Sequence, residues 1–345
     1  MKRFLLHHQL LAIFVLLAIA AIAAEIVLQR RPLPAYAADL ILLQGADIDV
    51  HMPSNDLRLL YTLRPNIDIE FKPRGKPPRR VTTNSLGLRD PERSLTKPDN
   101  VYRIVIFGSS TTYGAEVAGD ETMPACLERI LNERYPEGPS FEVWNAGTSA
   151  YTPMQEAALA ERLIERGLEA DVLLFQINID GPRAFLYGHI DPSAFARDPS
   201  LLAEHFLLPD WLSLKATAWV VAHSRLALLL LAHVNRMAGA EKRELGFEKI
   251  HEAHHANAMT AFRERYGDHF RLAALNVPCL KPDDNHEVRR SAGPAGIPTW
   301  CVQVEDGDPE LMLLHPPAWV YRIWAQTLAD LLAQHKFLPN DSQEN

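Results

Sequence analysis

Residues Tyr102 to Gly114 read Y-R-I-V-I-F-G-S-S-T-T-Y-G, and this stretch decides the fold. The segment Val101 to Phe107 is apolar and rich in β-forming side chains, without the spacing of a helix, which predicts a buried strand. Gly108 breaks this strand, and the four hydroxyl side chains of residues 109–112 follow it. Open α/β sheets bind their ligands at the carboxyl ends of their strands. The stretch therefore has two interpretations, a serine-rich turn or a loop that carries a nucleophilic serine.

The run G-S-S-T-T-Y-G at residues 108–114 resembles the first motif of the SGNH (GDSL-like) hydrolases, in which Gly-Asp-Ser or Gly-Gly-Ser is followed by Thr or Leu. The resemblance covers roughly residues 84–335 and implies that Ser110 is the nucleophile. Ser109 stands where the family usually has Asp or Gly. The resemblance also implies a flavodoxin-like strand order, and we expect no cofactor.

Five apolar segments predict the strands of one mainly parallel sheet, and amphipathic segments between them predict helices on both faces. The fold class expected is therefore α/β, a three-layer α/β/α sandwich. The strands are expected at 101–107, 140–144, 171–177, 270–277 and 299–304, and the helices at 120–134, 155–166, 247–266 and 317–335, with Asp120 as the cap of the first helix.

Two further strand ends carry candidate oxyanion donors. Asn145-Ala146-Gly147 resembles the family's second motif, which implies that the backbone N–H of Gly147 faces the oxyanion, although a turn glycine fits equally well. The family's third motif is Gly-x-Asn-Asp, whereas this chain has Asn178-Ile179-Asp180-Gly181. Asp180 then occupies the position of the oxyanion asparagine, where a carboxylate repels the developing charge. Either Asn178 is the donor in a shifted register, or the site is weakened, at a typical cost of about 10²–10³ in rate.

The family's last motif is Asp-x-x-His before the final helix, and here Leu314-His315-Pro316 precedes that helix. The resemblance implies that His315 is the general base for Ser110, but the residue three before it is Met312. A base needs a group that fixes its tautomer. Three nearby acids or a backbone carbonyl remain candidates for that role: Asp306, Asp308 and Glu310.

The N-terminus predicts a membrane segment. Lys2 and Arg3 precede an uncharged, mostly apolar run from Phe4 to Ala24, and about 20 apolar residues span a bilayer. A cleaved signal peptide with a small-residue site at residues 21–23 is the alternative. The length of the run favours a single uncleaved anchor over residues 1–31. Both interpretations place the main domain outside the cytoplasm of a bacterial cell, either at the cell exterior or, if the cell is Gram-negative, in the periplasm.

The remaining organisation follows from composition. Residues 32–83 are rich in proline and polar groups and are expected to form an extracytoplasmic spacer with one or two small strands. The hydrolase-like domain is expected over 84–338, with an insertion at 182–246 and a disordered tail at 339–345. The segment Asn84 to Asp90 is similar to an N-x-x-G-x-R segment of membrane-anchored relatives, in which Arg89 is either near the pocket or part of a turn.

The second apolar run, Ala216 to Val234, is predicted to be a buried helix or a lid, because Arg225 near its centre is costly in a bilayer. Three histidines at 251, 254 and 255 have helical spacing, but no acid or cysteine has ligand spacing to them, and no metal is expected. The net charge of −8 argues against nucleic acid as a partner. Cys279 and Cys301 are expected to pair on export.

Together these features predict an extracytoplasmic serine esterase that acts on acylated glycans or lipids through Ser110 and His315. An O-acyltransferase of the same chemistry is an alternative. A second alternative, supported by Met312 and Asp180, is a non-catalytic member that binds a glycan or a partner protein at the membrane.

Overall fold

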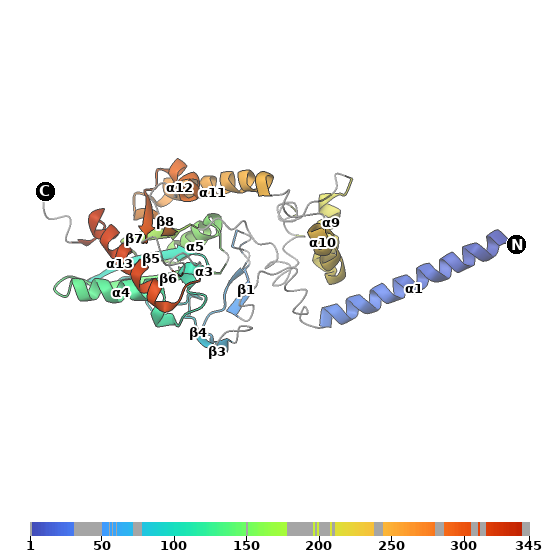
Figure 1. Ribbon diagram of the computed structural model, residues 1–345, viewed down its shortest axis with the longest axis horizontal. Coiled ribbons are helices and arrows are strands. Elements are labelled where there is room, and N and C mark those ends of the chain that lie inside the picture. The colour runs from blue at the N-terminus through green and yellow to red at the C-terminus, as the bar shows by residue number, and fades with distance from the viewer. Residues whose placement is uncertain are drawn as a thin grey trace. The chain divides into compact units, whose positions relative to one another are not determined.

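The computed structural model describes residues 2–30, 50–54, 56, 58–59, 61–71, 78–149, 151–177, 196, 199, 208, 211–237, 244–279, 286–304, 310 and 315–339. The chain divides into two compact units (Figure 1). One unit comprises Met1–Ala46 and Arg183–Glu244, and the other comprises Asp47–Pro182 and Leu245–Asn345.

The second unit is built on a five-stranded sheet in the order β6-β5-β7-β8-β9, and every neighbouring pair is parallel. This is the flavodoxin-like order, with the first strand of the sheet between the second and the third. The predicted fold class is confirmed. The strands are β5 Val101–Gly108, β6 Ser140–Gly147, β7 Val172–Gln176, β8 Arg271–Cys279 and β9 Thr299–Gln303.

Helices cover both faces of this sheet (Figure 1). Side chains alternate along a strand, so Ile104 and Ile106 of β5 pack in one cluster with α4 Met123–Arg134 and α13 Ala318–Gln334. On the other face, Phe107 stacks on Phe175, which contacts Phe262 of α11 Glu244–Tyr266 edge-on. The helix α5 Pro153–Glu165 contacts β5, and the strands are buried throughout their middle, as parallel strands between helices are.

Several element ends differ from the sequence-based expectation. Thr122, not Asp120, caps α4, because Gly119–Glu121 form a 3₁₀ turn and the Thr122 hydroxyl accepts the amide of Ala125 at 3.5 Å. β8 continues through Pro278 to Cys279. The predicted loop before β9 contains α12 His286–Ala292 and a 3₁₀ turn at Gly293–Ala295.

A disulfide joins Cys279 at the end of β8 to Cys301 in β9, with 5.5 Å between their Cα atoms. The parallel pairing of β8 and β9 brings these residues together. The expected pairing is confirmed, and Cys126 is a buried free thiol on α4, as its position on the apolar face of that helix indicates.

Two antiparallel hairpins lie in the region between the N-terminal helix and the sheet, and both belong to the second unit. Leu63 and Val81 of these hairpins and Val50, just before β1, form a small core with Tyr113 and Ala115, which lie three and five residues after Ser110. The strands are β1 His51–Pro53, β2 Tyr61–Leu63, β3 Asp68–Phe71 and β4 Arg79–Thr82.

The first unit contains α1 Lys2–Arg30, whose segment Ala12–Gln29 is long and apolar enough to cross a membrane and is exposed. The second apolar run was predicted as a single helix, and this prediction is wrong. It forms α9 Leu214–His223 and α10 Arg225–Met237, which are separated at Ser224.

The packing of α13 on the sheet predicts a large effect of truncation at its centre. Leu328 is fully buried in the cluster between α13, α4 and the sheet, so Leu328→Ala should lower the free energy of unfolding by about 2–5 kcal/mol. Gln326→Ala, at an exposed position of the same helix, should change it by less than about 0.5 kcal/mol. Urea denaturation followed by circular dichroism measures both, and equal effects would contradict the assignment of this core.

Candidate active site

Ser110 is the first residue of the short helix α3, Ser110–Tyr113, which follows β5 directly. Ser109 precedes it in an extended conformation, with φ −88° and ψ −151°, so the chain turns sharply from strand to helix. The carboxyl ends of three strands are level here, because Gly108 pairs with Gly147 of β6 and with Gln176 of β7. Ser110 is half-buried at this edge.

His315 lies three residues before α13, and the structure brings it to Ser110 across 205 positions of sequence. Its Nε2 is 2.7 Å from the Ser110 hydroxyl oxygen, a good hydrogen-bond distance. A hydroxyl in this contact can transfer its proton to the imidazole. A serine and a histidine in such contact can act as a nucleophile and its base.

Glu116 lies on the other side of the histidine ring. Its Oε1 is 3.7 Å from Nδ1 of His315, and both side chains are about one-third exposed. This acid was missed in the sequence, because the resemblance directs attention to residues shortly before the histidine. Glu116 instead follows Ser110 by six positions, and the sheet edge brings the two loops together.

Arg89 holds the loop that carries Glu116. Its buried guanidinium donates hydrogen bonds to the carbonyl oxygens of Tyr113, Gly114 and Val117, the last at 2.7 Å. The guanidinium carbon also lies 4.6 Å from the centre of the Tyr113 ring. Arg89 therefore fixes the backbone of residues 113–117, which follow Ser110 in the chain.

A turn delivers Arg89 to this place. The Asn84 side-chain oxygen accepts the amides of Leu86 and Leu88, each at 3.0 Å, and its amide nitrogen donates to the carbonyl of Pro91 at 3.1 Å. Gly87 has φ +75°, a left-handed conformation that glycine adopts without strain. The two interpretations of this segment are thus complementary, since the turn residues position the arginine.

Gly147 permits close contact between β6 and α3. A Cβ atom at this position would lie 2.2 Å from the amide nitrogen of Tyr113 and 2.7 Å from the carbonyl carbon of Thr112. The Gly147 amide donates to the side-chain oxygen of Asn145 at 3.0 Å. Gly147, the predicted oxyanion donor, therefore lies at the same edge of the sheet as Ser110, and its amide is hydrogen-bonded to the Asn145 side chain.

The other predicted oxyanion residues, Asn178 and Asp180, lie outside the described residues. The same holds for Met312, Asp306 and Asp308. Glu310 is described, and its carboxylate accepts the indole N–H of Trp319 at 3.2 Å. Within the described ranges, no cluster of three or more His, Cys, Asp or Glu side chains has the arrangement of a metal site.

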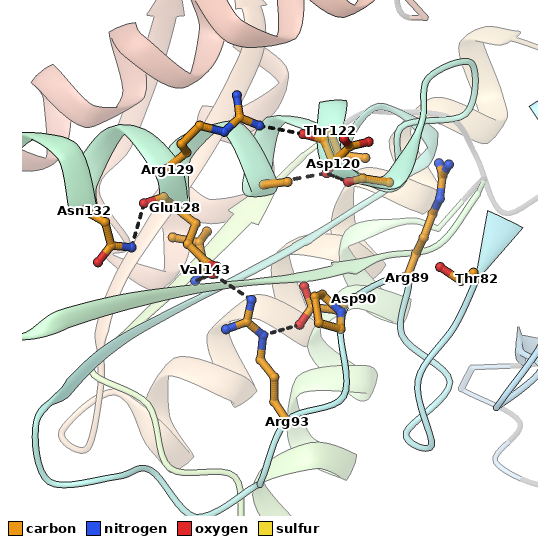
Figure 2. Close-up of a pocket in the computed structure, with 13 residues that line it drawn as sticks. Thr82, Arg89, Asp90, Arg93, Asp120, Thr122, Glu128, Arg129, Asn132 and Val143 are labelled. Atoms are coloured by element: carbon orange, nitrogen blue, oxygen red, sulfur yellow. Dashed lines mark hydrogen bonds and ion pairs between the residues drawn. The ribbon is translucent and has the colours of Figure 1, made fainter. Parts of the chain in front are cut away.

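A separate cavity of about 520 Å³ lies between the segment before β5 and α4 (Figure 2). Arg93 there bridges Asp90 at 2.8 Å and Glu128 at 2.7 Å. Burial raises the pKa of Asp90 to about 7. Neither Ser110 nor His315 lines this cavity, and its charged groups bind one another, so we interpret them as structural.

The packing at Gly147 predicts that even one added methyl group displaces α3. Gly147→Ala should lower the free energy of unfolding by about 1–3 kcal/mol, the usual range for overpacking. Gly119→Ala is the matched control, because nothing lies within 4 Å of the Cβ position there. Denaturant titration of both variants tests the prediction, and identical unfolding midpoints would contradict it.

No family model and no curated protein matches the sequence. Among solved structures, the chain is similar to LAE5, an α/β hydrolase from the Lake Arreo metagenome, at 15% identity and a TM-score of 0.38 over 67% of this chain and 94% of that one. A putative lipolytic protein of the G-D-S-L family from Desulfitobacterium hafniense is 11% identical, with a TM-score of 0.35, over 67% of this chain and 99% of that one. A point variant of the acetyl xylan esterase Axe2 from Geobacillus stearothermophilus is 12% identical, with a TM-score of 0.38, over 66% of this chain and 93% of that one. By its layers and strand order, the chain has the fold expected from the resemblance to the SGNH (GDSL-like) hydrolases.

Proposed function

We propose that this protein is a serine esterase that removes ester-linked acyl groups from glycans or lipids outside the cytoplasm. The observation that carries the proposal is the 2.7 Å contact between the Ser110 hydroxyl and Nε2 of His315 at the carboxyl edge of the sheet. Similarity to proteins described as esterases and lipolytic enzymes accords with this chemistry.

The reaction proceeds in two halves. His315 accepts the hydroxyl proton as the Ser110 oxygen attacks the ester carbonyl carbon, and the resulting tetrahedral adduct carries a negative oxygen. The adduct collapses, the bond to the alcohol oxygen breaks, and His315 returns the proton to the departing alcohol. Water then attacks the acyl-Ser110 ester by the same route, which releases the carboxylic acid and restores the serine.

The negative oxygen of the adduct needs hydrogen-bond donors. The Ser110 amide is at the first position of α3, where backbone N–H groups take no partner within the helix. The Gly147 amide can contribute if the carbonyl oxygen of the adduct replaces or shares the contact with Asn145. We retain Asn178 and Asp180 as the candidate third group at the end of β7.

We assign Glu116 the role of the acid that orients His315. An anion near Nδ1 favours the tautomer with the proton on that nitrogen, which leaves Nε2 free to accept from Ser110. It also stabilises the imidazolium that forms during attack. The brace from Arg89 to the carbonyls of Gly114 and Val117 holds the segment on either side of Glu116 in place.

Two observations support the extracytoplasmic location. The Cys279–Cys301 disulfide suits an oxidising compartment, where such bonds persist. The apolar helix α1 is long enough to anchor the chain in a membrane.

Removal of either member of the pair should abolish activity. Ser110→Ala and His315→Ala should each lower kcat by about 10³-fold or more, and the double variant should be no worse than either, because the two act as a unit. Hydrolysis of short-chain aryl esters by the purified full chain measures this. Wild-type protein that neither hydrolyses such esters nor reacts with a fluorophosphonate would overturn the proposal and favour a binding module.

Substitution of Glu116 should weaken the base without removing it. Glu116→Gln should lower kcat/KM about 10–100-fold, since a partly exposed charge pair contributes about 1–3 kcal/mol. The acidic limb of the pH profile should move to lower pH, because loss of the anion makes the imidazole harder to protonate.

Glu133→Gln, which alters an exposed carboxylate on α4, is the control and should leave both the rate and the profile unchanged. A profile for Glu116→Gln that coincides with that of the wild type would show that another group orients His315.

A further inference from the structure

We propose that α9 and α10 form a lipid-binding helix pair that lies on the outer surface of the bilayer crossed by α1. The inference rests on the proposed anchoring by α1 and goes beyond it, because it assigns a second membrane contact to residues 211–237.

The junction between α9 and α10 is held by Glu25 of α1. Its carboxylate accepts hydrogen bonds from the Ser224 hydroxyl at 2.8 Å and from the backbone amides of Arg225 and Leu226 at 2.9 and 3.0 Å. These amides begin α10, where they lack partners within the helix. The Arg225 guanidinium returns a hydrogen bond to the carbonyl of Leu28 at 3.1 Å. The start of α10 is therefore fixed to the last turns of α1.

The position of Glu25 along α1 sets the depth of this junction. The apolar segment Ala12–Gln29 is about 27 Å long as a helix, close to the ~30 Å hydrocarbon core of a bilayer. Glu25 lies four residues, about 6 Å, before the end of this segment and therefore near the outer boundary of the core. The amino end of α10 must lie at the same depth.

Both α9 and α10 carry apolar side chains that are exposed in the described part of the structure. In α9, Trp219 is 59% exposed and Val220 is 45% exposed, while Ala218 and Val221 are buried. In α10, Leu230 and Val234, one helical turn apart, are 57% and 59% exposed. A tryptophan at the hydrocarbon boundary and an apolar helix stripe are features of helices that lie in a membrane interface.

The charge of the segment suits a lipid surface. Residues 211–237 include Lys215, Arg225 and Arg236 and contain no aspartate or glutamate. Cationic side chains beside an apolar face favour bilayers that contain anionic lipids. The exposed apolar side chains of α1 continue the same kind of surface across the junction, so a bilayer is the occupant that covers both.

Site-directed labelling tests this in the full chain. Cys126 is buried and the other two cysteines form the disulfide, so an introduced cysteine is the accessible thiol. Leu230→Cys is labelled with a nitrobenzoxadiazole dye and reconstituted in phosphatidylcholine–phosphatidylglycerol vesicles with and without brominated acyl chains. We expect the brominated lipid to quench this label about twofold, because an interfacial helix buries its apolar face at the acyl boundary.

Two further labels separate the possible failures. Glu133→Cys, at an exposed position on α4, gives the baseline for a surface label. Ile19→Cys, near the middle of α1, should be quenched most by bromines near the chain ends if α1 spans the bilayer. If the label at position 19 is quenched and the label at position 230 shows only baseline quenching, the proposal for α9 and α10 is overturned while the anchoring by α1 stands. Baseline quenching at 19 overturns the anchoring itself. If lipid does not quench the label at position 230 and mass photometry shows that the chain is dimeric, the exposed surface is assigned to a second copy of the chain. This result also overturns the proposal.

Discussion

The buried guanidinium of Arg89 is the interaction on which the arrangement of the site depends. A buried cation is costly unless its donors are satisfied. Here the donors meet carbonyl oxygens of Tyr113, Gly114 and Val117 at the end of the short helix that begins with Ser110. The same contacts fix the segment with Glu116. The Arg89 side chain thus connects the turn before the sheet with the backbone that carries Ser110 and Glu116.

Arg89 also supports the acid that we propose for His315. In the family that the sequence resembles, the orienting acid precedes the histidine by three residues, whereas Glu116 follows Ser110 by six. An acid three residues from the histidine is positioned largely by local backbone geometry. An acid on a separate loop needs its own support, and Arg89, delivered by the Asn84–Gly87 turn, provides it.

Local pattern was sufficient for most of the fold. The five strands, their parallel order and the end of α5 just before Gly167 follow from apolar runs, glycines and the family resemblance. The sequence could not reveal Glu116 or the role of Arg89, because both depend on contacts between distant segments. The break at Ser224 was missed for a similar reason. Residues 216–234 are mostly apolar, and no proline or glycine marks a break among them. The break coincides with hydrogen bonds to Glu25, about 200 positions earlier in the chain.

The junction at Glu25 has a consequence for biosynthesis. Its three hydrogen-bond donors are 199, 200 and 201 residues away in the chain. At about 5–20 residues per second, the ribosome needs about 10–40 s to make the intervening sequence. Throughout that interval the carboxylate near the end of α1 lacks these partners, so other groups or water must solvate it. Assembly of the first unit is therefore completed only after much of the sheet has already been synthesised.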